Sequence, residues 1–266
     1  MSTPPKLFDR NALHHRRRRV PASADLFLHE IAANEFHEKL MGVKRELTKI
    51  AIVCGIPHVW QKHWPNADVL TDAETLEFPT NDYDLIIHAM CLHQTNDPLG
   101  QLIQCQRMLK PDGLFVAGLF GGSTLATLRS TLATAETEVT GGLSPRVSPM
   151  AEIRDLGGLL QRAGFALPVA DNFVQNVTYN NIRHLARDLR AHAETNVLTA
   201  RSKSMPNRRI FDHADHQLGT PFNVAFEFIF LTGWCPHQSQ QKPLRPGSAQ
   251  VSLTDVLIPP TPDDKD

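Results

Sequence analysis

The clearest pattern of hydrophobic and polar positions in this chain lies between residues 83 and 125. Residues 83–90 (YDLIIHAM) form a short apolar run, which is typical of a parallel strand buried on both faces. Asp97 stands directly before a proline, which predicts a helix start, and apolar residues follow at helical spacing. A Lys-Pro-Asp-Gly turn then leads into a second apolar run, residues 114–120. The pattern predicts a strand–helix–strand unit of a parallel sheet.

The same periodicities predict the remaining elements. Residues 49–55 are expected to form the first strand of the sheet. Residues 173–179 and 222–230 alternate between apolar and polar, which predicts two half-buried strands that pair as a closing antiparallel hairpin. Helices are expected over residues 26–40, 124–139 and 156–163 and from residue 182 onward.

Composition narrows the class of protein. A chain of 266 residues with 41% hydrophobic and 21% charged residues is typical of a globular α/β protein. The net charge of −1 gives no global field toward nucleic acid, so no nucleic-acid partner is expected. No apolar run reaches the length of a membrane span, and no leader pattern is visible. The 4 cysteines show no CxxC spacing, which favours reduced thiols and a cytoplasmic location.

Residues 16–19 are consecutive arginines, and two interpretations are open for them. Such a run can grip phosphate, which would allow peripheral association with a membrane although no transmembrane segment is expected. The alternative, which we favour, is a solvated face of a first helix.

Several motifs resemble one family. The stretch LKPDGLF, residues 109–115, resembles the turn before the fifth strand of class I S-adenosylmethionine (SAM) methyltransferases. Three longer stretches, residues 120–149, 155–171 and 233–249, together with LFDR at residues 7–10, resemble the methyltransferase-fold assembly factors of respiratory complex I. The resemblance is to the assembly factor 5 group and its alphaproteobacterial branch.

This resemblance implies a Rossmann-like, doubly wound α/β fold with a mostly parallel sheet and an antiparallel last strand. It implies SAM as the cofactor and a subunit of the peripheral arm of complex I as the protein partner. Relatives in the group are credited with hydroxylating an arginine rather than methylating one.

The resemblance also suggests how the chain is divided. Residues 1–45 are expected to form an N-terminal arm and capping helix, residues 46–232 the α/β domain, and residues 233–266 a proline-rich tail with a disordered end. The α/β domain is expected to be truncated between residues 56 and 70, because a strand–helix–strand unit alone takes about 30 residues. The family's second strand and following helix are therefore predicted to be missing.

The cofactor motif after the first strand is degenerate. Only Gly55 remains of a GxGxG pattern, and residues 56–58 add an isoleucine, a proline and a histidine where the turn must be tight. Asp72 and Ala73 resemble the end of the family's third strand, where an acidic residue faces the adenine. The alternative for Asp72 is a helix N-cap for residues 73–76.

Further candidate cofactor contacts follow the next strand. His88 and Ala89 end it at the carboxyl edge of the sheet, where ligands bind in such folds. His93 matches a histidine of the family's "LHW" motif. Because His88 and His93 are expected to face opposite ways, no metal site is predicted.

Ser144 and Arg146 are the candidate substrate contacts. They lie in a segment that forms a loop near the pocket mouth in relatives, and the alternative is plain turn chemistry beside two prolines.

The sequence leaves three hypotheses for function. The chain is an active SAM-dependent methyltransferase on a protein substrate, an arginine-hydroxylating assembly factor, or a non-catalytic assembly or binding module. The degenerate glycine turn and the shortened region after it favour the third, with impaired or lost SAM binding. No catalytic residue can be named, and whether the chain is an enzyme, its substrate and its oligomeric state stay open.

Overall fold

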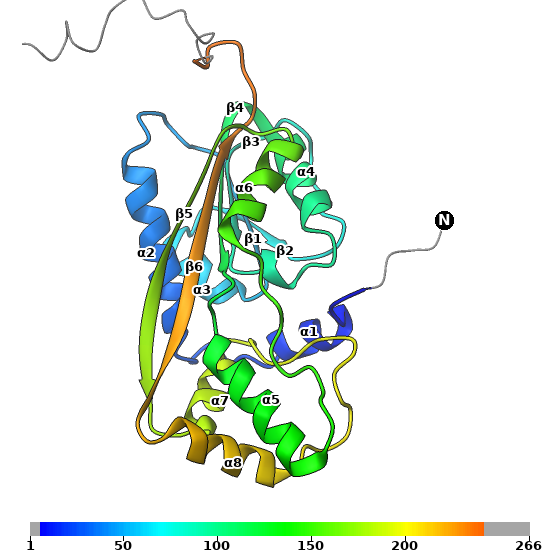
Figure 1. The fold of residues 1–266 in the computed structure, drawn as a ribbon. Helices are drawn as coiled ribbons and strands as arrows, with labels where there is room; N and C mark the ends of the chain where they lie inside the picture. The colour runs from blue at the N-terminus through cyan, green and yellow to red at the C-terminus, as the bar shows by residue number, and fades with distance from the viewer. Residues whose placement is uncertain (1–5, 242–266) are drawn as a thin grey trace, which may run out of the picture. The chain divides into compact units, whose positions relative to one another are not determined.

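A computed structural model describes residues 6–241, and its centre is a six-stranded sheet with the order β2-β1-β3-β4-β6-β5 (Figure 1). The strands are β1 (Ile50–Cys54), β2 (Asp68–Thr71), β3 (Tyr83–Ala89), β4 (Leu109–Phe120), β5 (Ala166–Tyr179) and β6 (Phe222–Trp234). The helices are α1 (Arg10–Arg17), α2 (Phe27–Met41), α3 (Pro57–His63), α4 (Pro98–Met108), α5 (Ala126–Thr140), α6 (Ile153–Arg162), α7 (Ile182–Ala191) and α8 (Arg208–Leu218), with a 3₁₀ turn η1 (Leu92–Gln94).

The described residues divide into two units, one that ends at Pro236 and one that begins at His237. Every helix and strand within the described part of the chain belongs to the first of these units. The disordered end that the sequence predicts for the tail lies outside the described residues.

The predicted strand–helix–strand unit is confirmed as β3, α4 and β4. All residues of β3 are buried, as expected of a parallel strand between two helical layers. Asp97 caps α4 by accepting a hydrogen bond from the Gly100 backbone nitrogen at 2.8 Å, and Pro98 takes the first helical position. The Lys-Pro-Asp-Gly turn lies inside the bounds of β4, where Asp112 has a φ of 63°.

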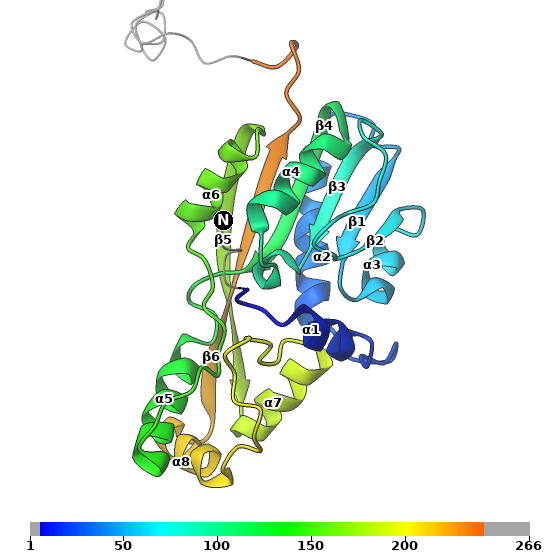
Figure 2. The same cartoon turned by 90° about the vertical axis from the view of Figure 1, so that its right-hand side faces the viewer.

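Helices cover both faces of the sheet (Figure 2). One face packs against α2 and α3, with Phe36 and Trp60 among the fully buried side chains. The other packs against α4 and α6, with Leu102 and Leu160 buried in a second cluster. The doubly wound architecture predicted from the sequence is therefore confirmed.

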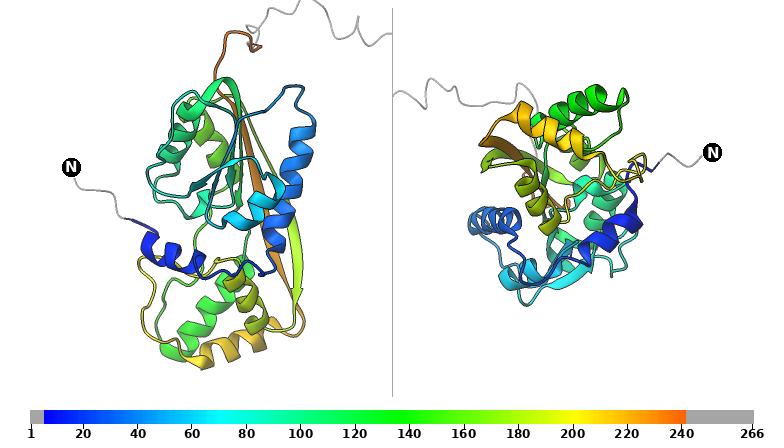
Figure 3. Two further views of the ribbon diagram at one scale, coloured as in Figure 1. Left: turned by 180° about the vertical axis from the view of Figure 1, so that it is seen from behind. Right: turned by 90° about the horizontal axis from the view of Figure 1, so that it is seen from below.

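β5 and β6 form the predicted antiparallel hairpin, and it is longer than the alternation alone indicated. β6 pairs with β4 only through residues 228–234, whereas its pairing with β5 continues to Phe222 opposite Tyr179. The hairpin therefore extends past the end of β4, and α5, α7 and α8 gather around this extension (Figure 3).

The region after β1 is as short as the sequence predicted: one short helix, α3, and one more strand, β2. β2 pairs directly with β1, with Ala51 opposite Asp68 and Cys54 opposite Thr71. In dinucleotide-type folds the strand beside the first is the second strand. We predicted that residues 67–74 take the place of a third-strand end. These residues include β2, which lies beside β1 as the edge strand of the described sheet, as expected if the family's second strand is missing.

None of the described helices is long and apolar enough to cross a membrane.

Candidate functional site

Helix α1 lies at the carboxyl ends of β1 and β2, held there by a distant part of the chain (Figures 1 and 2). Asp9 caps the helix by accepting from the Ala12 backbone nitrogen at 3.0 Å, and it accepts from Arg201 Nη2 at 2.8 Å. Phe8 forms an isolated antiparallel bridge with Leu198, and both side chains are buried. These contacts fix the helix where a cofactor of a Rossmann-like fold would lie.

The side chain of Arg17 lies against Gly55, directly after the carboxyl end of β1. Its guanidinium donates through Nη1 to Asp72 Oδ2 and through Nη2 to Gln94 Oε1, the latter at 2.9 Å. A Cβ added at Gly55 would overlap the Arg17 side chain. A side chain at this position would therefore require the Arg17 side chain to move, and only 8% of that side chain is exposed. Our interpretation of residues 16–19 as a solvated face is wrong for Arg17.

Asp72 is paired through both carboxylate oxygens. Besides Arg17, Arg10 Nη2 lies 3.0 Å from Oδ1, and the Asp72 side chain is 1% exposed. Burial by itself would raise the pKa of Asp72, but Arg17 and Arg10 outweigh it and lower that pKa to about 2. Residues 73–76 form no helix, so the N-cap alternative for Asp72 is wrong.

His88 joins this ion pair through Gln101. Gln101 Oε1 lies 2.7 Å from His88 Nε2, and its amide nitrogen donates to Asp72 Oδ1 at 3.3 Å and to the carbonyl of Ala73. His88 is fully buried, and burial lowers its pKa. Ala89 is also buried and pairs with Cys54 in the sheet, where it supplies no polar group to the site.

His93 is connected to Arg17 through Gln94 and Glu194. Gln94 donates through Nε2 to Glu194 Oε2 at 2.7 Å, and His93 Nε2 lies 3.2 Å from the same carboxylate. Asp72, His88 and His93 are therefore brought into one continuous polar network with Arg17 at its centre. The described residues contain no group of three metal-ligating side chains.

Ser144 and Arg146 contact Glu136 on α5. Ser144 Oγ donates to Glu136 Oε1 at 2.7 Å, and Arg146 Nε donates to Oε2 at 2.9 Å. Burial acts to raise the pKa of Glu136, and Arg146 and Ser144 overcome it, so that this pKa is lowered. Arg146 lines the same cavity as His93, whereas Ser144 does not.

Residues of α1 line two cavities. The smaller, about 450 Å³, is lined by Gly55, Asp72 and Ala73 together with Arg10 and Arg17. The larger, about 760 Å³, lies among α1, η1, the end of β4, α5 and α7. Arg16 of α1 lines the larger cavity, and Arg10 and Arg17 of the same helix line the smaller one.

Sequence reasoning missed Arg10, Arg17, Gln94 and Gln101 as members of the network. A signal was present: Arg10, Leu13 and Arg17 stand at helical spacing on one face, and Leu13 is buried. Gln94 and Gln101 carry no such signal, because amides are common on exposed helix faces.

Residues 27–117 match the family described as "Methyltransferase domain". A solved methyltransferase-like structure from Bacillus halodurans superposes with a TM-score of 0.51 at 13% identity, covering 77% of this chain and 99% of that one. This chain has a methyltransferase fold. The likeness at this low identity concerns the fold alone.

Among curated relatives, the methyltransferase-fold chain is 36% identical over 214 residues to human "Arginine-hydroxylase NDUFAF5, mitochondrial", covering 74% of this chain and 60% of the relative. The zebrafish (Danio rerio) protein of the same name is 35% identical over 198 residues, covering 72% and 62%. A malonyl-[acyl-carrier protein] O-methyltransferase of Xylella fastidiosa is 30% identical over 188 residues, covering 66% and 60%. The chain thus spans about 60% of the length of these relatives. The resemblance inferred from the sequence is confirmed.

Proposed function

We propose that this chain is an assembly or binding module with a methyltransferase fold, in which SAM binding is impaired or lost. The observation that carries the proposal is the Arg17 side chain, which lies against Gly55 and pairs with Asp72 at the cofactor edge. The partner, by resemblance to complex I assembly factors, is a protein subunit of the peripheral arm.

The residues at the edge do not fit SAM in this arrangement. In dinucleotide-type folds a carboxylate in the position of Asp72 accepts from the ribose hydroxyls. Both oxygens of Asp72 are already held by arginines. The backbone at Gly55, where the ligand would approach, is covered by the Arg17 side chain. SAM carries a positively charged sulfonium, and the cavity beside Gly55 is lined by further cationic groups, Arg10 and Arg18.

Isothermal titration of the purified chain with SAM tests the proposal. We expect no saturable heat at millimolar SAM from a protein that melts cooperatively. Saturable binding at micromolar affinity would overturn it. Arg17→Ala is titrated in parallel, with Arg19→Ala as the matched control, since Arg19 lies on the same arm but does not line the smaller cavity. A pull-down of peripheral-arm subunits with the wild-type chain tests the partner.

The second candidate function is an active enzyme, a SAM-dependent methyltransferase or an arginine hydroxylase. Asp72 favours it, because it directly follows the strand beside β1, where a ribose-binding carboxylate stands in related folds. In that case α1 must leave the edge before SAM enters. Gain of SAM binding by Arg17→Ala, with none by wild type, would show that Arg17 closes the site under either function, and modification of a peripheral-arm subunit by the wild-type chain would identify the enzyme.

A further inference from the structure

We propose that the larger cavity binds an anionic amphiphile: a carboxylate or phosphate head on an aliphatic chain. The inference goes beyond the proposed function and does not depend on whether SAM binds. The volume of about 760 Å³ lies within the range of roughly 300–1,000 Å³ that small-molecule sites occupy.

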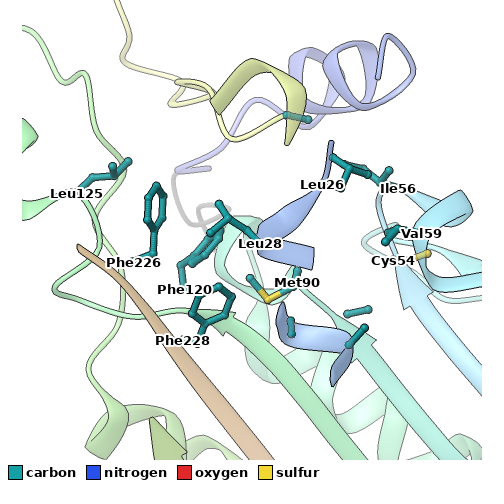
Figure 4. Packing of buried hydrophobic residues seen from close by; sticks show 14 of the residues in the cluster. Leu26, Leu28, Cys54, Ile56, Val59, Met90, Phe120, Leu125, Phe226 and Phe228 are labelled. Carbon is teal, nitrogen blue, oxygen red and sulfur yellow. The ribbon is translucent and has the colours of Figure 1, made fainter. Parts of the chain in front are cut away.

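The interior of the cavity is apolar. Phe120 and Phe226 line it from the sheet, and Leu125 lines it from the start of α5; all three are labelled in Figure 4. Leu128 and Leu185 add aliphatic surface from α5 and α7. Such a lining favours a hydrocarbon chain, because burying each methylene removes apolar surface from water.

The polar part of the lining is cationic. Four arginines contribute to it: Arg16, Arg19, Arg146 and Arg190. Arg146 is paired with Glu136. Within the described part of the chain, no carboxylate forms an ion pair with the other three. The Nη1 atom of Arg16 instead donates to Thr195 Oγ1 at 2.8 Å and to the Asn196 carbonyl.

The carboxylate in the cavity lining already has hydrogen-bond partners. Glu194 is the only carboxylate among the described lining residues, and it is engaged by His93 and Gln94. The unpaired guanidinium groups therefore dominate the charge, and they favour an anionic head over a cationic one.

A buried polar atom in the lining also lacks a partner. The His93 side chain is 2% exposed, and its Nδ1 has no hydrogen-bond partner among the described residues. Nε2 of the same ring faces the Glu194 carboxylate, and His93 is among the residues that line the cavity. The cationic lining argues against an arginine side chain as the occupant, although the relatives are named arginine hydroxylases.

Calorimetric titration of the full chain with four probes of equal chain length tests the proposal: dodecanoate, dodecyl phosphate, dodecan-1-ol and dodecylammonium, the alcohol below its solubility and the others below their micellar concentrations. We expect one-to-one binding of the two anions, binding of the alcohol roughly tenfold weaker, and weaker binding still of the ammonium. Octanoate should bind more weakly than dodecanoate, by about fourfold for each methylene lost while the chain remains buried. The preferred anion identifies the head group.

A matched pair of charge reversals on α7 assigns the site. Arg190→Glu should weaken dodecanoate binding by about fivefold to tenfold, and Arg187→Glu should change it by less than about twofold. Both arginines are exposed, so neither variant is expected to unfold, but only Arg190 lines the cavity. Equal affinities for all four probes, no heat from any of them, saturable binding of arginine amide, or equal effects of the two variants would overturn the proposal. These titrations contain no SAM, so their results do not depend on whether the chain binds SAM. Failure of this proposal can therefore be distinguished from failure of the proposed function.

Discussion

The guanidinium of Arg17 lies on the carboxylate of Asp72, a residue 55 positions away, and both side chains are almost completely withdrawn from solvent. The pair joins α1 to the carboxyl end of the sheet at the point where relatives of this fold bind their cofactor. Arg10 contacts the same carboxylate, so the helix is attached through two guanidinium groups.

Removing Arg17 should destabilise the fold. Arg17→Ala leaves a buried carboxylate with one cation in place of two, and we expect a loss of about 3 kcal/mol in the free energy of unfolding. Urea denaturation followed by circular dichroism measures it. Arg19→Ala, at an exposed position, should lie within about 0.5 kcal/mol of wild type. Equal effects of the two variants would mean that the Arg17 ion pair contributes little.

Gly55 should be tolerant of a side chain only when Arg17 is absent. Gly55→Ala places a methyl group on the Arg17 side chain, so we expect destabilisation of about 1–3 kcal/mol. In the Arg17→Ala background the same change should cost less than about 1 kcal/mol, because the obstructing atoms are gone. A double-mutant cycle measures the difference. Additive effects would contradict the close approach.

Stability should fall in acid through Asp72. Its pKa is lowered to about 2 in the folded protein, against about 3.9 in an unfolded chain. The unfolded state therefore takes up the proton first as pH falls, so the contribution is complete above about pH 4 and is lost toward pH 2. Urea midpoints at pH 5 and pH 3 measure this loss. Asp72→Asn should show a smaller decrease between the two pH values, although it is less stable at both.

Glu136 should hold the loop that carries Ser144 and Arg146. Glu136→Ala removes the acceptor of both side chains and leaves the Arg146 guanidinium partly buried without its partner, so we expect a loss of about 3 kcal/mol. Ser144→Ala removes one hydrogen bond and should cost about 1 kcal/mol. Chemical denaturation of both variants compares them. A larger loss for Ser144→Ala than for Glu136→Ala would refute this assignment.

The sequence predicted the core of the fold well because that part depends on local patterns. An uninterrupted apolar run, an Asp-Pro helix start and an alternating pair of strands each fix one element, and β3, α4 and the β5–β6 hairpin formed as expected. The shortness of the segment after β1 was predictable from the number of residues available between β1 and β2.

The site was less predictable because its contacts are long-range. Helical spacing puts Arg17, unlike Arg18, on the face of Leu13, but it does not reveal that the Arg17 side chain pairs with Asp72, 55 positions away. The position of Asp72 depends on β2 pairing directly with β1, which residue spacing did not determine. The family resemblance supplied Asp72 and His93 as candidates, and the predicted strand end supplied His88, but neither supplied the arginine that links them.

The extension of the β5–β6 hairpin past β4 has a consequence for how the protein opens. Residues 222–227 of β6 pair with β5 alone, whereas residues 228–234 have a strand on each side. A ladder with one partner strand can separate without disturbing the parallel sheet. Helix α5 contacts β6, α7 contacts β5, and α8 packs on both helices. Backbone amides there should exchange with deuterium through a local opening at a lower free energy than those of β3. The walls that α5 and α7 give to the larger cavity would open with it, so the cavity would have a route of entry that leaves the sheet intact.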